Sequence, residues 1–202
     1  MAEVELPKHE ELEELKGKAF TKRVALTTAL YAVVLAIASL GGTNAMKHML
    51  LAQQQASDQW SFYQAKVIRE HQYRIQKLRL EVDLAERGRT MKPEARQKFE
   101  ELQAKLTDEE KRYNTEKKEI EQEAKKLEQE RDLYRTKDPY FDYAEVLLQI
   151  AIVMASIAIL ATSRPLFFFS LGLAGLGAFL TLNGFMLFLK IPFLHGGTKL
   201  NR

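Results

Sequence analysis

The stretch from Val24 to Met46, VALTTALYAVVLAIASLGGTNAM, decides the fold, because it contains no Asp, Glu, Lys, Arg or His. A helix needs roughly 20 largely apolar residues to cross about 30 Å of hydrocarbon, and this stretch is long enough. Two further stretches, Val146 to Ser163 and Pro165 to Leu189, also carry no charge. Three such segments in one chain indicate three membrane-spanning helices.

Aromatic residues extend the second apolar stretch, which is the shortest of the three. Tyr140, Phe141 and Tyr143 directly precede it, as in the aromatic belts at membrane interfaces. A water-soluble protein of 202 residues would need three core helices that are apolar all round. We therefore expect an all-α membrane protein with transmembrane helices over residues 24–46, 140–163 and 165–189.

The charged residues lie between and outside these stretches. Residues 1–23 form a polar N-terminal tail, in which an acid-rich segment predicts a short helix that ends at Gly17, and residues 190–202 form a C-terminal tail. The first span is too long, and its preceding tail too acidic, for a cleavable signal peptide. Basic residues barely outnumber acidic ones, and the net charge is only +3. The chain therefore lacks the basic surface that nucleic acid requires.

The sequence contains no recognisable catalytic or cofactor motif. It has no cysteine, which excludes disulfides, thiolate metal sites and thiol nucleophiles. The four histidines are not spaced as paired metal ligands, and no Ser-His-Asp arrangement, phosphate loop or dinucleotide fingerprint is present. We expect a protein that is not an enzyme and that has no metal or cofactor.

Residues 47–139 predict a long helical hairpin outside the membrane. Gly88 and Pro93 mark a helix stop and a new start, which places the turn near 87–93. Each arm then has roughly 40 to 45 residues, or about 60 to 65 Å of helix. Arms of similar length that return to one bilayer surface predict an antiparallel, coiled-coil-like hairpin.

Apolar residues recur every seven positions in the second arm, as in one column of a coiled-coil seam. The companion column begins at Leu102 and continues as glutamates at 109, 116, 123 and 130. The predicted apolar column comprises Phe99, Leu106, Tyr113, Ile120, Leu127 and Tyr134.

The first arm has two columns with the same spacing. His71 lies within one of them, where a polar residue commonly sets the register or the number of strands. A seam with so few apolar residues is marginal within one chain. We therefore expect the chain, which has the lipid bilayer as one partner, to associate laterally with copies of itself. The two columns are Ile68, Ile75 and Val82, and His71, Leu78 and Ala85.

An aromatic segment, ASDQWSFYQAK, opens the first arm at residues 56–66. Trp60, Phe62 and Tyr63 make it strongly apolar, either as a packing anchor or as a patch for a protein partner. With its flanking apolar spans, this segment resembles an uncharacterised bacterial membrane-protein family catalogued as domain of unknown function 4337. The likeness covers the chain from about Val24 onward, and it implies a bacterial membrane location without a known activity, cofactor or catalytic residue.

The third span contains small and polar residues that predict packing between membrane helices. Gly172, Gly175 and Gly177 allow close approach of helix backbones. Asn183, and Gln149 in the second span, are polar groups that need partners in lipid. We interpret both amides as contacts between helices, with a polar pathway as the alternative for Asn183.

These observations leave three hypotheses for function. The first is an oligomeric structural or scaffold protein whose hairpin binds copies of itself or a partner. The second is a pore or transport component built from oligomerised third spans, and the third is an accessory subunit of a larger complex. The resemblance implies a bacterial membrane, which we take as the inner (cytoplasmic) membrane. Basic residues before the first span, such as Lys22 and Arg23, favour a cytoplasmic N-terminus and an external hairpin, whereas Lys190, Lys199 and Arg202 oppose this orientation.

Overall fold

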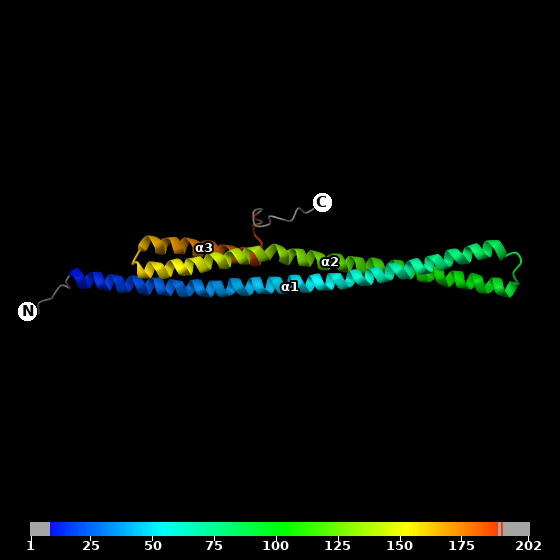
Figure 1. Ribbon diagram of the computed structural model, residues 1–202, viewed down its shortest axis with the longest axis horizontal. Coiled ribbons are helices and arrows are strands. Elements are labelled where there is room, and N and C mark those ends of the chain that lie inside the picture. Colours follow the sequence, from blue (N-terminus) through cyan, green and yellow to red (C-terminus); the bar gives the residue numbers. More distant parts are fainter. Residues whose placement is uncertain (1–8, 190, 192–202) are drawn as a thin grey trace, which may run out of the picture. The chain divides into compact units, whose positions relative to one another are not determined.

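The computed structural model describes residues 9–189 and 191, with side chains from Gly17 onward. It contains three helices, α1 (His9–Arg87), α2 (Pro93–Leu160) and α3 (Arg164–Met186) (Figure 1). No strand occurs within these described residues. The all-α prediction is confirmed, and each helix is long and apolar enough to cross a membrane.

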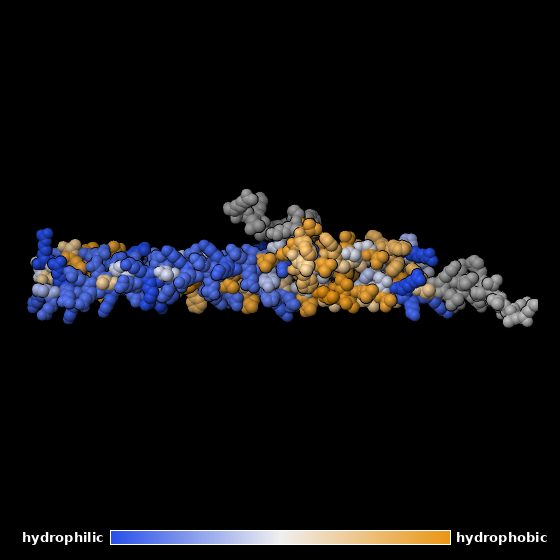
Figure 2. Space-filling model, turned by 180° about the vertical axis from the view of Figure 1, so that it is seen from behind, coloured by the Kyte–Doolittle hydropathy of each residue, from blue (hydrophilic) through white to orange (hydrophobic). Residues whose placement is uncertain are grey.

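The chain divides into two compact units, and α1 and α2 contribute to both. The apolar unit comprises Met1–His48 and Leu133–Arg202, and the hairpin unit comprises Met49–Asp132. Hydrophobic side chains dominate the surface of the apolar unit, whereas hydrophilic side chains dominate that of the hairpin unit (Figure 2). Apolar surface of this extent needs a non-aqueous environment or a partner to cover it.

The turn of the hairpin unit lies between Arg87 and Pro93, the residues that bound the predicted turn. The amide of Gly88 donates to the Leu84 carbonyl at 2.9 Å, and the amide of Thr90 donates to Arg87 at 2.9 Å. Pro93 opens α2, where its missing N–H leaves no helical hydrogen bond unmade. The sequence signals at this turn therefore act through ordinary helix-end chemistry.

The predicted helix end at Gly17 is wrong, because α1 continues through it from His9. A glycine in a helix costs about 1 kcal/mol relative to alanine, which is too little to stop a long helix. The same helix passes through Gly41 and Gly42 without interruption, and α2 passes through Pro139. Gly41 and Gly42 are buried against the ring of Phe141, so they serve close helix packing.

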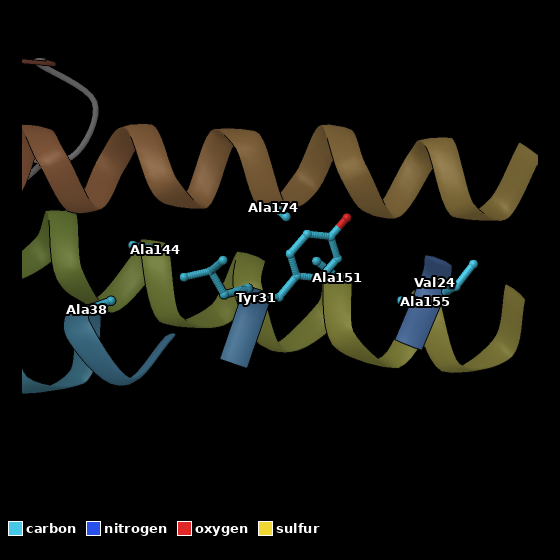
Figure 3. Packing of buried hydrophobic residues seen from close by; sticks show 8 residues of the cluster. Val24, Tyr31, Ala38, Ala144, Ala151, Ala155 and Ala174 are labelled. Carbon is cyan, nitrogen blue, oxygen red and sulfur yellow. The ribbon is translucent and has the colours of Figure 1, made fainter. Parts of the chain in front are cut away.

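Small side chains at heptad spacing form the core of the apolar unit. Figure 3 shows the Tyr31 ring of α1 among Ala151 of α2 and Ala174 of α3, in one cluster of buried residues. Alanine and glycine let helix backbones approach closely, so van der Waals contact between the helices stabilises the unit. The buried positions include Val24, Tyr31, Ala38, Gly41, Gly42 and Ala45 on α1, Tyr140, Phe141, Ala144, Leu148, Ala151, Ala155 and Ala158 on α2, and Ser170, Ala174, Gly177, Thr181, Asn183 and Gly184 on α3.

The connection between α2 and α3 is tight. Thr162 adopts a left-handed conformation with φ 47°, and the amide of Ser163 donates to the Ala158 carbonyl at 3.0 Å. This arrangement is typical of a helix end closed by a left-handed residue. Pro165 lies in the first turn of α3, where its fixed φ favours a new helix.

Candidate interaction sites

The two arms of the hairpin unit run antiparallel, as the contacts between their side chains show. Trp60 contacts Glu128, whereas Arg74, farther along α1, contacts Glu110 of α2. Gln103 then reaches Glu81 close to the turn. Residue numbers therefore rise along one arm while they fall along the other.

The apolar column predicted for the second arm does face the first arm. Leu106 is 7 % exposed and Tyr113 is 5 % exposed, and the other members of the column are partly buried. The companion column faces the first arm only in part, because Leu102 is 47 % exposed whereas Glu116 pairs with Lys66. The adjacent column that also lies inward comprises Gln103, Glu110, Lys117, Ala124 and Arg131.

The columns predicted for the first arm do not face the second arm. Ile68 is 58 % exposed and Ile75 is 60 % exposed. The inward face of α1 carries smaller, aromatic and charged residues, of which Ala56, Glu70 and Leu80 are buried. The apolar heptad in the first arm is real, but it lies on the outer surface of the hairpin unit.

We call this outer surface the α1 stripe. Its members follow alternating steps of three and four residues, so they form one continuous face on the helix. Leu78 is 52 % exposed, and Val82 is 56 % exposed. The stripe comprises Ile68, His71, Ile75, Leu78, Val82 and Ala85.

A buried carboxylate occupies the middle of the hairpin seam. Glu70 is 2 % exposed, and it accepts hydrogen bonds from Lys117, from Asn114 at 3.1 Å and from Arg74 at 3.2 Å. Burial alone would raise the pKa of the Glu70 carboxyl, but the bonds from Lys117 and Asn114 outweigh it, and this pKa lies below its ordinary value. Glu70 is therefore held as an anion inside the seam.

Two further carboxylates, which form three ion pairs, connect the arms beside Glu70. Glu110 accepts from Lys77 at 2.5 Å and from Arg74 at 2.8 Å, and both hydrogen bonds lower the pKa of its carboxyl. Glu116 accepts from Lys66, which lowers the pKa of this carboxyl in the same way. These pairs fix the register of the arms, because a shift of one arm would separate them.

Tyr113 lies at the centre of a group of cations. Its ring stacks on Tyr73 with centroids 5.5 Å apart, and Lys66 and Arg112 each lie 5.0 Å from the ring centroid. Arg69 and Arg112 donate to its hydroxyl, which lowers the pKa of the phenol. The residue that the sequence assigned to an apolar column thus also organises charge.

The aromatic residues at the start of the first arm have two different roles. The Trp60 indole N–H donates to Glu128 at 3.0 Å, and the ring lies edge-on to Tyr63 with centroids 5.4 Å apart. Phe62 is 60 % exposed. Trp60 and Tyr63 therefore anchor the two arms to each other, whereas Phe62 adds apolar surface to the outside.

Some glycines of α3 pack against neighbouring helices, and others are exposed. A Cβ atom on Gly177 would lie 2.8 Å from Leu148 Cγ, so this glycine lets α3 pack against α2. No atom lies within 4 Å of a Cβ placed on Gly172 or Gly175, so these two face outward from the apolar unit. The expected close packing thus holds at Gly177 and at Gly184, another glycine of the same apolar stretch.

The side chain of Asn183 is hydrogen-bonded to the segment that follows α3, and it does not line an open path through the apolar unit. It is 1 % exposed, its side chain donates to the Leu189 carbonyl at 2.8 Å, and it accepts from the Leu189 amide at 2.8 Å. The Tyr140 hydroxyl donates to the same carbonyl at 2.8 Å. These bonds explain why α3 ends at Met186, three residues before the apolar stretch does.

Gln149, the polar residue singled out in the second apolar stretch, points away from the other helices of the apolar unit. It is exposed on α2 and makes no hydrogen bond with another described residue. Asp142 and Ser156, seven residues to either side, are also exposed, so a polar column follows the outer face of α2.

No group of three or more potential metal-ligating side chains occurs within the described residues. The histidine and topology predictions also use His195, Lys190, Lys199 and Arg202, and these residues lie outside the part of the chain that the structure describes.

These features define a class: an all-helical protein in which three helices are long and apolar enough to cross a membrane. The chain belongs to the family described as Domain of unknown function (DUF4337), whose profile matches residues 20–187. No curated protein and no solved structure matches the chain.

Sequence reasoning missed Glu70, the most buried charged residue of the described part. The first arm is rich in charge, and nothing in the local pattern separates Glu70 from its exposed neighbours. Its signal lies in the second arm, since Asn114 and Lys117 become its partners only once the register is known.

Proposed function

We propose that the protein is an oligomeric membrane scaffold. In this proposal α1, α2 and α3 each cross the bilayer once, and the hairpin unit binds copies of the chain through the α1 stripe. The support for three spans is that each helix contains a stretch long and apolar enough to cross a membrane.

The α1 stripe is the observation that carries the proposal. Four large apolar side chains of the stripe are each more than half exposed, namely Ile68, Ile75, Leu78 and Val82. Heptad-spaced apolar residues of this kind pack against another helix in coiled coils. Covering each side chain stabilises an assembly by about 1.5 to 3 kcal/mol, so several together support stable association.

The weak seam of the hairpin favours the same conclusion. Few large side chains, such as Leu106 and Tyr113, are buried in it beside the charged ones. Partly exposed ion pairs contribute only about 0 to 1 kcal/mol each. A hairpin with so small a buried core gains stability when a second copy covers its apolar outer face. The exposed Gln149 supports association within the bilayer, because a polar side chain facing lipid gains from a partner.

The same surface would serve an accessory subunit, in which the partner that covers the α1 stripe is a different protein. The pore hypothesis has weaker support, since both polar ends of the Asn183 amide already bond to Leu189. In a bacterial inner membrane, basic residues favour the cytoplasmic side. Arg23 and Arg164 line one hollow at the same end of the apolar unit, which favours a cytoplasmic N-terminus and an external hairpin.

Native mass spectrometry of protein extracted gently from its own membranes tests the proposal. The double variant Ile75→Gln with Leu78→Gln should weaken the homo-oligomer by about tenfold or more, since each 1.4 kcal/mol corresponds to a factor of ten. The matched control is Gln76→Ala with Arg79→Ala, which changes two exposed residues of the same helix turn outside the stripe. The control should assemble as the wild type does.

Three outcomes would overturn the scaffold proposal. A monodisperse monomer in several mild membrane mimetics would exclude self-association. A fixed stoichiometry with a second protein would make the chain an accessory subunit. Solute flux through reconstituted protein, abolished by a change in the third span, would favour the pore.

A further inference from the structure

An open hollow lies at the end of the apolar unit where α1 enters its apolar stretch and α3 begins. Its volume is about 390 Å³. Two arginines and three phenylalanines surround it, so a strongly charged part adjoins an apolar part. The lining residues are Ala19, Phe20, Arg23, Arg164, Phe167 and Phe168.

The two arginines are not neutralised within the described part of the chain. Neither Arg23 nor Arg164 makes an ion pair with another described residue, and no acidic side chain among the described residues lines the hollow. Two cations beside one hollow repel each other unless an anion lies between them. The charge of the hollow therefore calls for an anion that the described part of the chain does not supply.

The start of α3 adds to this positive charge. Arg164 is the first residue of α3, the end at which the helix dipole is positive and a cation is unfavourable. The first turn contains no acidic residue, and the side chain of Ser163 makes no capping hydrogen bond. An anion in the hollow would offset both the arginine charges and the helix dipole.

The aromatic walls indicate which anion fits. The rings of Phe20 and Phe167 meet edge to face with centroids 6.0 Å apart, and Phe168 is 65 % exposed. Inorganic phosphate gains nothing from such walls, whereas a lipid places acyl chains directly below its phosphate. Arg23 immediately precedes Val24, and Arg164 follows the end of the second apolar stretch, so both lie where an apolar span gives way to polar residues.

We infer that this hollow binds an acidic phospholipid, with Arg23 and Arg164 on the headgroup phosphate and Phe20, Phe167 and Phe168 against the acyl chains. This inference rests on the proposed membrane-spanning arrangement. A guanidinium binds phosphate through two parallel hydrogen bonds, which suits both arginines to the task. A zwitterionic lipid fits less well, because its cationic headgroup would meet two further cations.

The test is a titration of the purified, detergent-solubilised full chain with phosphatidylglycerol or phosphatidylcholine, followed by native mass spectrometry. The wild type should bind phosphatidylglycerol about tenfold more tightly than phosphatidylcholine, an estimate based on charge-assisted hydrogen bonds. Arg23→Gln with Arg164→Gln should abolish this preference, and Arg23→Lys with Arg164→Lys should keep most of it. The charge-matched control, Arg89→Gln with Lys92→Gln in the hairpin turn, should bind as the wild type does.

Equal binding of the two lipids by the wild type would overturn the inference, and this result needs no variant to fold. An equal loss of the phosphatidylglycerol preference in the control variant would also overturn the inference, since the overall positive charge of the chain would then explain the preference. Displacement of the lipid by inorganic phosphate at comparable concentration would identify a free-anion site instead. Extraction of the protein from membranes by alkaline carbonate would refute the spanning proposal separately, because it does not depend on lipid selectivity.

Discussion

The ring of Phe141 fills the space that a side chain on Gly184 would occupy. A Cβ atom at position 184 would lie 2.9 Å from Cε1 of this ring, which is itself 2 % exposed. The ring also lies against Gly41 and Gly42 of α1, and it meets Phe185 edge to face with centroids 4.9 Å apart. One aromatic side chain thus holds all three helices of the apolar unit together.

Replacing Gly184 by alanine should destabilise the apolar unit by about 1 to 3 kcal/mol, because the added methyl group overpacks the site. Gly175→Ala is the matched control, since a Cβ atom there has no neighbour within 4 Å. Thermal unfolding in one detergent should show a lower midpoint for Gly184→Ala and little change for the control. Equal midpoints would show that Phe141 moves aside without cost.

Removing Lys117 should destabilise the hairpin unit by about 2 kcal/mol, because it withdraws the principal partner of a buried carboxylate. Glu70→Leu together with Lys117→Leu should recover most of the loss, since no unpaired charge then remains in the seam. Urea unfolding followed by fluorescence of Trp60, the single tryptophan of the chain, reports on this unit. Arg96→Leu, which breaks an exposed pair with Glu100, should change little.

The hairpin unit should lose stability in acid. The pKa values of Glu70 and Glu110 are held below the ordinary value of 4.5. A carboxyl with a lowered folded pKa stabilises the fold above its unfolded pKa, and this contribution is lost as the pH falls through the folded pKa. Trp60 fluorescence should therefore report weaker resistance to urea as the pH falls below 4.5.

The matched variant for the acid experiment is Glu70→Gln with Glu110→Gln. It should be less stable than the wild type at neutral pH, and its stability should depend less on pH below 4.5. An unchanged pH dependence in this variant would assign acid sensitivity to other carboxyls.

Replacing Asn183 by leucine should destabilise the end of α3 by about 1 to 2 kcal/mol, because the amide and the carbonyl of Leu189 each lose a hydrogen bond. Asn44→Leu changes an exposed asparagine and serves as the control. Limited proteolysis should detect faster cleavage after α3 in Asn183→Leu alone. Unchanged cleavage would mean that the Tyr140 hydroxyl holds Leu189 without help.

The sequence predicted the second arm of the hairpin better than the first, for a physical reason. In the second arm the largest apolar residues, such as Leu106 and Tyr113, are also the ones that pack inward. In the first arm the large apolar residues Ile68 and Ile75 lie outward, and the inward face uses Ala56 and Glu70. Periodicity identifies a face of a helix, but it does not tell which neighbour covers that face.

The small residues of the third span illustrate the same limit. The sequence does not distinguish one glycine of α3 from another. A Cβ atom on Gly177 would contact Leu148, whereas a Cβ atom on Gly172 or Gly175 would have no neighbour within 4 Å. Their difference comes from the rotation of α3 about its own axis, which depends on contacts with residues far away in the sequence. The amide of Asn183 likewise found its partner six residues along its own chain, rather than on another helix.

The sequence by itself determined the helical class, the three apolar segments and the position of the turn, because these depend on local composition and on Gly88 and Pro93. The tertiary structure alone decided that Glu70 is buried with Lys117, that Phe141 fills the space beside Gly184, and that the α1 stripe is exposed. Each of these features pairs residues that are far apart in the chain. Such pairing depends on the register and rotation of packed helices, which no local pattern of residues encodes.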